Sequence, residues 1–364
     1  MIYLDHASTT YVYSDIADLI NLNIRHYWGN PSNLYAFGEQ SKSAINVARE
    51  NIAKALGVLP EEIFFTSGSS EGNTWALNQR PRTVCSAYEH HSITKNVNAV
   101  MVDEQYLDGV LETKQRIINA RYDNFIYSHM LVNNISGEIF DVKTLTEKAH
   151  KAEMLVHSDM TQALGNLSIN LYDLRVDMAT FSGHKVHAPK GIGFNFFKKS
   201  TFEKKEIRPL IFGEQERALR GGTENVPYII ALGVAVIKAV EGIEKKQDYC
   251  KKLKKVFLDK MKESGVDYNI VSPSNSIDST VSICLKNVES EILSTMLSDK
   301  AIYFGTGSAC NTGLMENDST LEAMGIEPEY IRGLIRLSFD LTNTEEEIIE
   351  FVDELVKAYK EIVV

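Results

Sequence analysis

Cysteine is scarce in this sequence, and its spacing excludes two common uses of the residue. The 364 residues contain four cysteines, which stand far apart and form no CxxC pair. A disulfide framework and a zinc site are therefore both disfavoured, and we predict no bound metal. Unpaired cysteines are typical of a reduced compartment, so we expect a cytoplasmic protein.

Long apolar runs and an excess of positive charge are also missing. The longest apolar run covers residues 228–237, well short of the roughly 20 residues that a membrane-spanning helix needs. The N-terminal residues lack the basic and then apolar pattern of a signal peptide. Asp and Glu outnumber Lys and Arg by 49 to 38, which works against a nucleic-acid or anionic-membrane surface. We expect no nucleic acid and no membrane among the direct partners.

The order of elements over the first two thirds of the chain is typical of an α/β protein. Residues 41–56 have the apolar spacing of an amphipathic helix, and residues 62–66 form a short apolar strand. Further apolar runs at 124–127, 154–157 and 178–181 alternate with polar or helical stretches. This alternation predicts a mainly parallel sheet covered by helices.

From about residue 247 the pattern changes to that of a smaller α+β domain. A Lys-rich helix reaches about residue 264, strands are expected at 279–285 and 334–339, and a capping box at 344–347 begins a last amphipathic helix. We therefore predict a large α/β domain over 12–245. The small domain would consist of 1–11 and 246–364.

One lysine and one aspartate are candidate catalytic residues because each follows an apolar strand. Lys185 stands in the segment Phe-Ser-Gly-His-Lys at 181–185, and Asp159 closes the strand before it. Ligands of open α/β sheets collect at such strand ends. Pyridoxal 5′-phosphate (PLP) needs a Schiff-base lysine and an acid against its ring nitrogen. The alternatives to these catalytic roles are purely structural: Lys185 would be a surface lysine in a turn, and Asp159 would cap a helix.

Two further segments complete the candidate site. Thr-Ser-Gly-Ser-Ser at 66–70 leaves a strand and opens a helix, so Ser69 and Ser70 offer hydroxyls and backbone N–H groups for a phosphate. The segment does not match the P-loop pattern, which disfavours an ATPase. Cys310 lies among small residues at 305–313, a setting that suits an exposed thiol able to ionise.

Taken in order, these motifs resemble those of the NifS-type cysteine desulfurases, PLP enzymes of the class V aminotransferase superfamily. The resemblance runs almost from end to end. It includes Tyr-Leu-Asp-His-Ala at 3–7, Gly-Asn-Pro-Ser at 29–32, Glu-His at 89–90, Arg-Gly-Gly-Thr at 220–223 and Gly-Ser-Ala-Cys at 307–310. The implied architecture is the fold type I of PLP-dependent transferases.

The resemblance also implies a role for each matching residue. Lys185 would bind the cofactor covalently, Asp159 would contact the ring nitrogen, and His90 would stack on the ring and move protons. Asn134 and Arg336 would bind the substrate, the arginine by a bidentate contact to its carboxylate. The ring hydroxyl and the phosphate would be held by Gln162, Ser69, Ser70, Ser182, His184 and, from a neighbouring subunit, Thr223.

The implied activity is conversion of L-cysteine to L-alanine, with the sulfur carried as a persulfide on Cys310. A sulfur-acceptor protein, such as an iron–sulfur scaffold or a tRNA-thiolation enzyme, would then receive it. The typical family member is a homodimer. These partners are expectations from the resemblance alone.

Some positions depart from the family pattern and leave other functions open. The departures surround the expected substrate and dimer regions, and they are Tyr35, Ile135, Glu214, Asp340 and Leu341. One alternative is another class V PLP enzyme, either an aminotransferase or a selenocysteine lyase. A second is a PLP-binding sulfur-carrier or assembly protein with little turnover.

Overall fold

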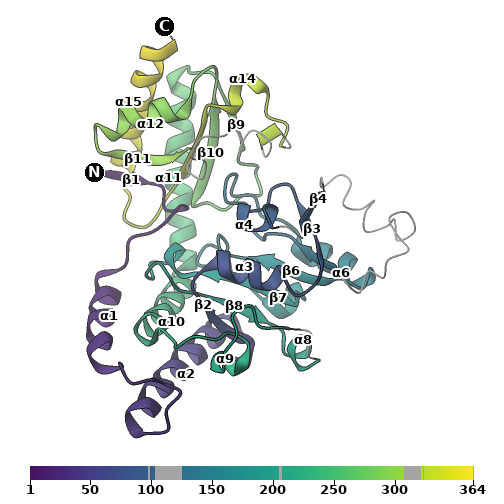
Figure 1. Cartoon of the computed structure of the whole chain (residues 1–364). Helices are drawn as coiled ribbons and strands as arrows, with labels where there is room; N and C mark the ends of the chain where they lie inside the picture. The colour runs from purple at the N-terminus through teal and green to yellow at the C-terminus, as the bar shows by residue number, and fades with distance from the viewer. Residues whose placement is uncertain (97–98, 103–124, 205–206, 307–320, 323, 364) are drawn as a thin grey trace. The chain divides into compact units, whose positions relative to one another are not determined.

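The computed structural model describes the chain except for residues 97–98, 103–124, 205–206, 307–320, 323 and 364. The described chain divides into two compact units (Figure 1). The small unit comprises 1–9, 132–139 and 242–364, and the large unit comprises 10–131 and 140–241. Residues 132–139, which the sequence analysis assigned to the large domain, group with the small unit.

The large unit is built around a seven-stranded sheet with the order β2-β8-β7-β6-β5-β3-β4. Only β8 runs antiparallel to its neighbours among these described strands. Most strands are wholly buried and rich in apolar residues, as expected for a sheet covered on both faces. Their bounds are β2 Ile63–Thr66, β3 Arg82–Ser86, β4 Ala99–Val102, β5 Phe125–Ser128, β6 Leu155–Asp159, β7 Met178–Ser182 and β8 Gly193–Phe197.

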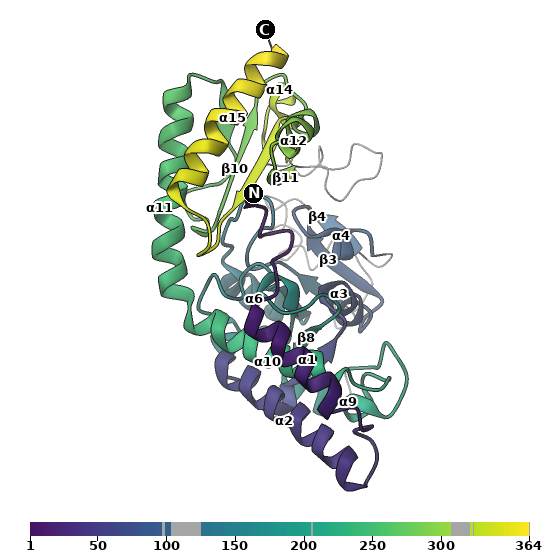
Figure 2. The same ribbon diagram turned by 90° about the vertical axis from the view of Figure 1, so that its left-hand side faces the viewer.

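Helices cover this sheet and bury an aromatic core. Phe64, Trp75 and Phe197 pack together with no exposed surface. The helix α10 packs against α1 and α2 (Figure 2). The helices are α1 Ser14–His26, α2 Ala36–Leu56, η1 Pro60–Glu62, α3 Ser69–Leu77, α4 His91–Thr94, α6 Val142–Lys151, α7 Leu171–Leu174, η3 Gly183–Lys185, α8 Lys199–Glu203, α9 Gln215–Ala218 and α10 Val226–Glu241.

The small unit contains a five-stranded sheet with the order β1-β11-β12-β10-β9. The strands β1 Ile2–Leu4 and β11 Ile302–Thr306 are parallel, and the other pairs are antiparallel. The remaining elements are β9 Tyr268–Ile270, β10 Thr280–Leu285, β12 Leu334–Ser338, α11 Ile243–Ser264, α12 Ser290–Ser298, α14 Pro328–Ile331 and α15 Glu345–Val363.

The last helix begins as the sequence predicts. Thr344 Oγ1 accepts the Glu347 N–H and Glu347 Oε2 accepts the Thr344 N–H, both at 3.2 Å. This reciprocal pair is the predicted capping box. Phe351 and Leu355 of α15 then pack into the core of the unit with Phe257 of α11.

No single helix in the described part of the chain is long and apolar enough to cross a membrane. The consecutive helices α10 and α11 pass that test of length and composition only as a bent pair.

Candidate functional site

Lys185 lies in a one-turn helix, η3, that directly follows β7 at the carboxyl edge of the large sheet. The backbone of this turn is fixed by Thr10, whose N–H and hydroxyl both donate to the His184 carbonyl, at 2.9 and 3.0 Å. The Thr10 hydroxyl oxygen in turn accepts the His187 N–H at 2.8 Å. The lysine therefore stands on a braced turn at the sheet edge where ligands of α/β folds bind.

His187 gives this turn a second support. Its backbone has a φ of +64°, a left-handed conformation that disfavours residues with a side chain. The imidazole stacks on Tyr13 with the ring centroids 3.9 Å apart. We infer that this stack and the hydrogen bond to Thr10 stabilise the unusual backbone next to the lysine turn.

Asp159 ends β6, the strand beside β7, and is fixed by two donors. Its Oδ1 accepts the Thr161 N–H at 2.9 Å, and its Oδ2 accepts the Asn73 amide at 2.8 Å. The side chain is 7% exposed. Because β6 and β7 are parallel neighbours, their ends bring Asp159 and the Lys185 turn to the same edge of the sheet.

A chain of polar contacts extends from this carboxylate to His90. The Asn73 amide also donates to Ser92 Oγ at 2.8 Å, and Ser92 Oγ lies 2.8 Å from His90 Nδ1. His90 Nδ1 accepts the Ser92 N–H at 3.1 Å, which places the proton of the neutral ring on Nε2. Burial lowers the pKa of His90, and Lys185 adds to this against the opposing effect of Asp159.

The predicted phosphate turn lies beside the end of β7. A Cβ atom added to Gly68 would stand 3.7 Å from Ser182 Oγ, and one added to Gly193 of β8 would lie 2.8 Å from the Gly68 Cα. Ser69 and Ser70 are the first residues of α3, so their N–H groups have no intrahelical acceptor and form the positive end of the helix dipole. The structure thus places three predicted phosphate-binding residues together.

The other predicted cofactor residues lie on neighbouring segments. Burial lowers the pKa of His184 to about 4, with Lys185 and Lys190 adding to the effect, so this imidazole is neutral at pH 7. Gln162 follows Asp159 in the turn after β6. Thr223 is exposed on the loop before α10.

This donor set fits PLP. The group requires an anion for its ring nitrogen, a lysine for its carbonyl carbon and N–H or hydroxyl donors for its phosphate. Asp159, Lys185 and the start of α3 offer these at one edge of the sheet. Asn73 and Ser92, which the sequence analysis did not single out, connect the acid to His90.

The two predicted substrate residues meet in the small unit. Arg336 Nη1 donates to the Asn134 carbonyl at 2.8 Å, while Nη2 donates to Asp5 Oδ1 at 2.7 Å and to Ser8 Oγ at 2.6 Å. Both Nη2 hydrogens therefore have acceptors within the chain. A bidentate contact that uses Nη2 requires the substrate carboxylate to displace one of them. Asp5 and Ser8 were not predicted to act at this site.

Cys310 lies outside the described residues. The other three thiols, Cys85, Cys250 and Cys284, are buried, and burial is the main cause that raises the pKa of each to about 12. These thiols stay protonated near neutral pH and are poor nucleophiles.

The fold and the site together define a PLP-dependent enzyme with a large α/β unit and a smaller α+β unit. The sequence matches the family described as class V aminotransferases over residues 2–351. The chain belongs to this family. The predicted family, fold type I and PLP cofactor are thereby confirmed.

Individual relatives cover nearly the whole chain. The cysteine desulfurase IscS of Methanosarcina thermophila is 32% identical over 98% of this chain and 92% of its own length. The structure of a NifS-like protein from Rickettsia africae is 28% identical, with a TM-score of 0.87 and 99% coverage of both chains. The structure of SspA in complex with cysteine is 26% identical, with a TM-score of 0.76 over 94% of this chain and all of that one.

Proposed function

We propose that this protein is a PLP-dependent cysteine desulfurase that converts L-cysteine to L-alanine and transfers the sulfur through Cys310. The observation that carries this proposal is the placement of Lys185 and Asp159 at the ends of neighbouring parallel strands. Relatives that align over nearly the full length are named cysteine desulfurases, and one similar structure holds cysteine. The enzyme class predicted from the sequence agrees with these names.

The side chains divide the reaction among them. PLP, when bound, withdraws electrons from the substrate Cα and so makes its proton acidic. Lys185 Nζ takes that proton, Asp159 would hold the ring nitrogen of the cofactor, and Arg336 binds the substrate carboxylate. His90 is neutral and carries its proton on Nε2, so Nε2–H is a hydrogen-bond donor while Nδ1 accepts from Ser92. To pass a proton on, the ring must first be protonated on Nδ1 as well.

Sulfur transfer balances without an added oxidant or reductant. The Cys310 thiolate attacks the substrate sulfur, a new S–S bond forms, and the C–S bond of the substrate breaks. The electron pair of the C–S bond stays on Cβ, which takes a proton. Cα regains the proton that Lys185 took, and alanine leaves. The enzyme retains the sulfur as a persulfide for an acceptor protein. We propose Cys310 for this step because the three described thiols have pKa values of about 12.

We also propose a homodimer in the cytoplasm. Apolar side chains of the large unit are strongly exposed at Trp28 (73%), Leu34 (89%) and Phe212 (85%). Gln215 Nε2 donates to Ser32 Oγ at 3.4 Å, which connects the loops that carry them. Large exposed apolar side chains on connected loops are typical of a protein interface. A second copy would cover them and offer its exposed Thr223 to the neighbouring phosphate site.

The test is a comparison of the wild type with Cys310→Ala. Both purified proteins should show the visible absorbance of bound PLP. The wild type should release sulfide and alanine from L-cysteine in the presence of a thiol, and the variant should lose sulfide release while it remains yellow. Full sulfide release by the variant would favour a selenocysteine lyase or another class V enzyme. A yellow wild type that does not turn over cysteine would favour an aminotransferase or a sulfur-carrier protein.

A further inference from the structure

The segment 211–222 of the large unit forms a tight loop. It contains the short turn α9, whose backbone departs from right-handed helical geometry at Glu216 and Arg217. The Gly221 N–H donates to the Ile211 carbonyl at 2.8 Å, and the Gly222 N–H donates to Gln215 Oε1 at 2.9 Å. Within the loop, Glu216, Arg217 and Ala218 have φ values of 46°, 61° and 61°. Left-handed backbone is unfavourable for residues that carry a side chain. Contacts outside the loop must offset this cost.

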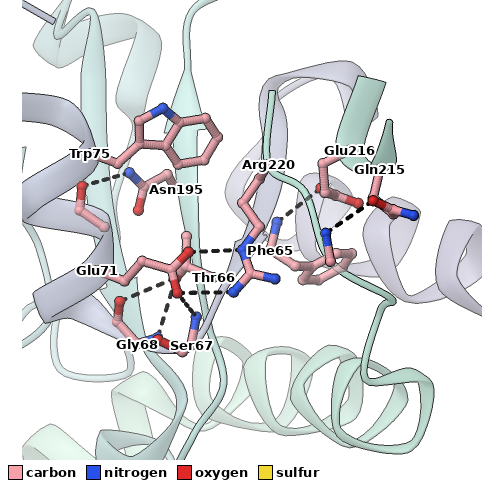
Figure 3. A network of polar contacts seen from close by, with 12 residues as sticks. Phe65, Thr66, Ser67, Gly68, Glu71, Trp75, Asn195, Gln215, Glu216 and Arg220 are labelled. Carbon is pink, nitrogen blue, oxygen red and sulfur yellow. Dashed lines mark hydrogen bonds and ion pairs between the residues drawn. The ribbon is translucent and has the colours of Figure 1, made fainter. Parts of the chain in front are cut away.

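Two ion pairs supply such contacts. The loop contributes the carboxylate to one of them and the guanidinium to the other. Glu216 of the loop binds Arg49 of α2 through both carboxylate oxygens, at 2.5 and 2.9 Å. Arg220 of the loop binds Glu71 of α3 through Nε and Nη2, at 2.9 and 3.0 Å (Figure 3). Both are two-point contacts, the strongest geometry for a guanidinium and a carboxylate.

Each carboxylate also binds the backbone of the phosphate turn or the strand that leads into it. Glu216 Oε2 accepts the Phe65 N–H at 3.0 Å, and Glu71 Oε2 accepts the Ser67 N–H at 2.8 Å. In Figure 3 the Glu71 carboxylate lies between the turn at Ser67 and the Arg220 guanidinium. The pair is therefore part of the frame of the phosphate turn, and Arg220 also precedes Gly221, Gly222 and Thr223.

The placement of Glu71 poses an electrostatic problem for a phosphate. Glu71 follows Ser69 and Ser70 in the first turn of α3, and its side chain is only 12% exposed. Burial raises the pKa of Glu71, but the hydrogen bonds from Arg220 and Ser67 outweigh it and leave the pKa below its ordinary value. The carboxylate is thus ionised, and without Arg220 its charge would repel a phosphate dianion bound at the same turn.

We propose that Glu71 and Arg220 are positioning residues for the cofactor phosphate: Glu71 fixes the turn, and Arg220 cancels its charge while tying the Gly221–Gly222–Thr223 segment to it. This inference rests on the proposed PLP site and deepens it. A purely mechanical brace would weaken in the same way when either partner is lost. Charge cancellation predicts instead that the two losses have opposite effects on a phosphate ligand.

The experiment measures dissociation constants of the apoprotein for PLP and for pyridoxal, which lacks the phosphate, by absorbance titration. Arg220→Gln should weaken PLP binding about tenfold or more, because an uncompensated carboxylate faces the phosphate. Glu71→Gln keeps an acceptor for Ser67 and frees the Arg220 cation, so its affinity for PLP should equal or exceed that of the wild type. The double variant should return to within about threefold of the wild type, because both charges are gone.

Two further measurements, the affinity for pyridoxal and the effect of salt on PLP affinity, separate an electrostatic role from a purely structural one. Affinity for pyridoxal should stay within about twofold in all variants, and added salt should reduce the Arg220→Gln defect, because salt screens the repulsion. Arg220→Lys keeps the charge without the two-point contact and should lose less affinity than Arg220→Gln. The control Arg332→Gln removes an exposed ion pair with Glu289 in the small unit and should change nothing.

Equal losses in the two single Gln variants, or equal losses of PLP and pyridoxal, would overturn the proposal. If Arg220→Gln does not fold, the comparison of Arg220→Lys with Glu71→Gln decides in the same way. A wild-type apoprotein that binds no PLP would refute the proposed function itself. Equal losses of affinity in Arg220→Gln and Glu71→Gln, with a wild type that binds PLP, would refute only the roles proposed for these two residues.

Discussion

Glu89 is a fully buried carboxyl group next to the candidate catalytic histidine. Its Oε1 accepts the Met130 N–H at 2.5 Å. Burial raises the pKa of Glu89 to about 7, and the charge of Asp159 adds to this, while His129 and the Met130 N–H oppose it. The side chain is therefore a proton-binding group in the interior of the large unit.

This pKa predicts how stability depends on pH. Above pH 4.5 the unfolded chain releases the Glu89 proton, whereas the folded chain keeps it up to about pH 7. The folded state binds more protons in this window, so stability falls as pH rises, by about 3 kcal/mol at most from this group. Glu89→Gln keeps an acceptor for Met130 and should flatten the pH dependence between pH 5 and 7. Denaturant unfolding at several pH values measures this, and an unchanged slope would contradict it.

Asp5 determines how much of Arg336 is available to a substrate. Its carboxylate and the Ser8 hydroxyl bind both Nη2 hydrogens of the arginine. Arg336 Nε is buried without a hydrogen-bond acceptor in the described structure. At the proposed substrate site, a carboxylate bound by Arg336 would compete with Asp5 for the same donors and would be repelled by its charge.

Asp5→Asn should lower the KM for L-cysteine several-fold with little change in kcat. The substituted side chain keeps an oxygen for Nη2 but removes the competing charge. Steady-state kinetics with L-cysteine measures both constants. Ser8→Ala is the matched control, because it removes a neutral acceptor from the same Nη2 group. A KM that rises in Asp5→Asn would mean that the charge of Asp5 holds the arginine in its binding position instead.

At the scale of elements, α3 connects two parts of the candidate site. Its first residues, Ser69 and Ser70, form the phosphate turn, and one turn later Asn73 binds Asp159 and Ser92. Asn73 has no exposed surface. Any change in the position of α3 therefore moves the phosphate donors and the acid together.

Asn73→Asp should weaken cofactor binding about tenfold and make it dependent on pH. The new carboxylate would face Asp159, and two carboxylates in contact share a proton, which raises the pKa of one of them. The partner of the ring nitrogen then loses part of its negative charge. Absorbance titration with PLP between pH 6 and 9 measures the effect. Asn73→Ser, which adds no charge, is the control, and an equal loss in both variants would show that only the packing of Asn73 matters.

The sequence predicts well those helices and strands that have a clear apolar pattern. The strands near 62–66, 154–157 and 178–181 are confirmed as β2, β6 and β7, and the strand-end argument placed Lys185 and Asp159 correctly at one edge. The helix predicted from residue 41 begins at Ala36, where no side chain caps it and no capping signal exists. The strand β8 was not predicted. Its segment Gly-Phe-Asn-Phe-Phe at 193–197 is interrupted by a glycine and an asparagine, so it lacks the continuous apolar run that marked the other strands.

The residues that the sequence analysis missed form hydrogen bonds with residues far away in the sequence. Asn73 and Asp159 are 86 positions apart, and Asp5 and Arg336 are 331 apart. A buried amide and an aspartate near a strand are ordinary residues in any sequence, so neither type nor spacing marks them. Only the fold shows which of them meet.

At the scale of the molecule, the segment 132–139 shows how the chain passes between its units. It leaves the large unit after Leu131 and joins the small one through specific hydrogen bonds. Ser282 Oγ donates to the Ile135 carbonyl and Ser272 Oγ donates to the Ser136 carbonyl, both at 2.6 Å. This excursion brings Asn134 to Arg336. The two proposed substrate residues of the small unit thus come from separate stretches of the chain.

The exposed apolar side chains of the large unit predict an assembly that a charged substitution should disrupt. Phe212→Glu should shift the protein from dimer to monomer, because a carboxylate buried at an interface without a partner costs several kcal/mol. Sedimentation velocity measures the change in mass. The matched control is Ile270→Glu on β9 of the small unit, where the replaced side chain is 54% exposed, and this variant should remain a dimer.

The same variant also tests whether the proposed site depends on the second copy. If the exposed Thr223 serves the neighbouring subunit, the monomer produced by Phe212→Glu should bind PLP more weakly than the Ile270→Glu dimer, while pyridoxal binding should differ little. A monomer with undiminished affinity for PLP would show that each subunit holds the phosphate with Ser69, Ser70 and Ser182 alone. The phosphate would then depend on the start of α3 and the end of β7, and the role proposed for Thr223 would be wrong.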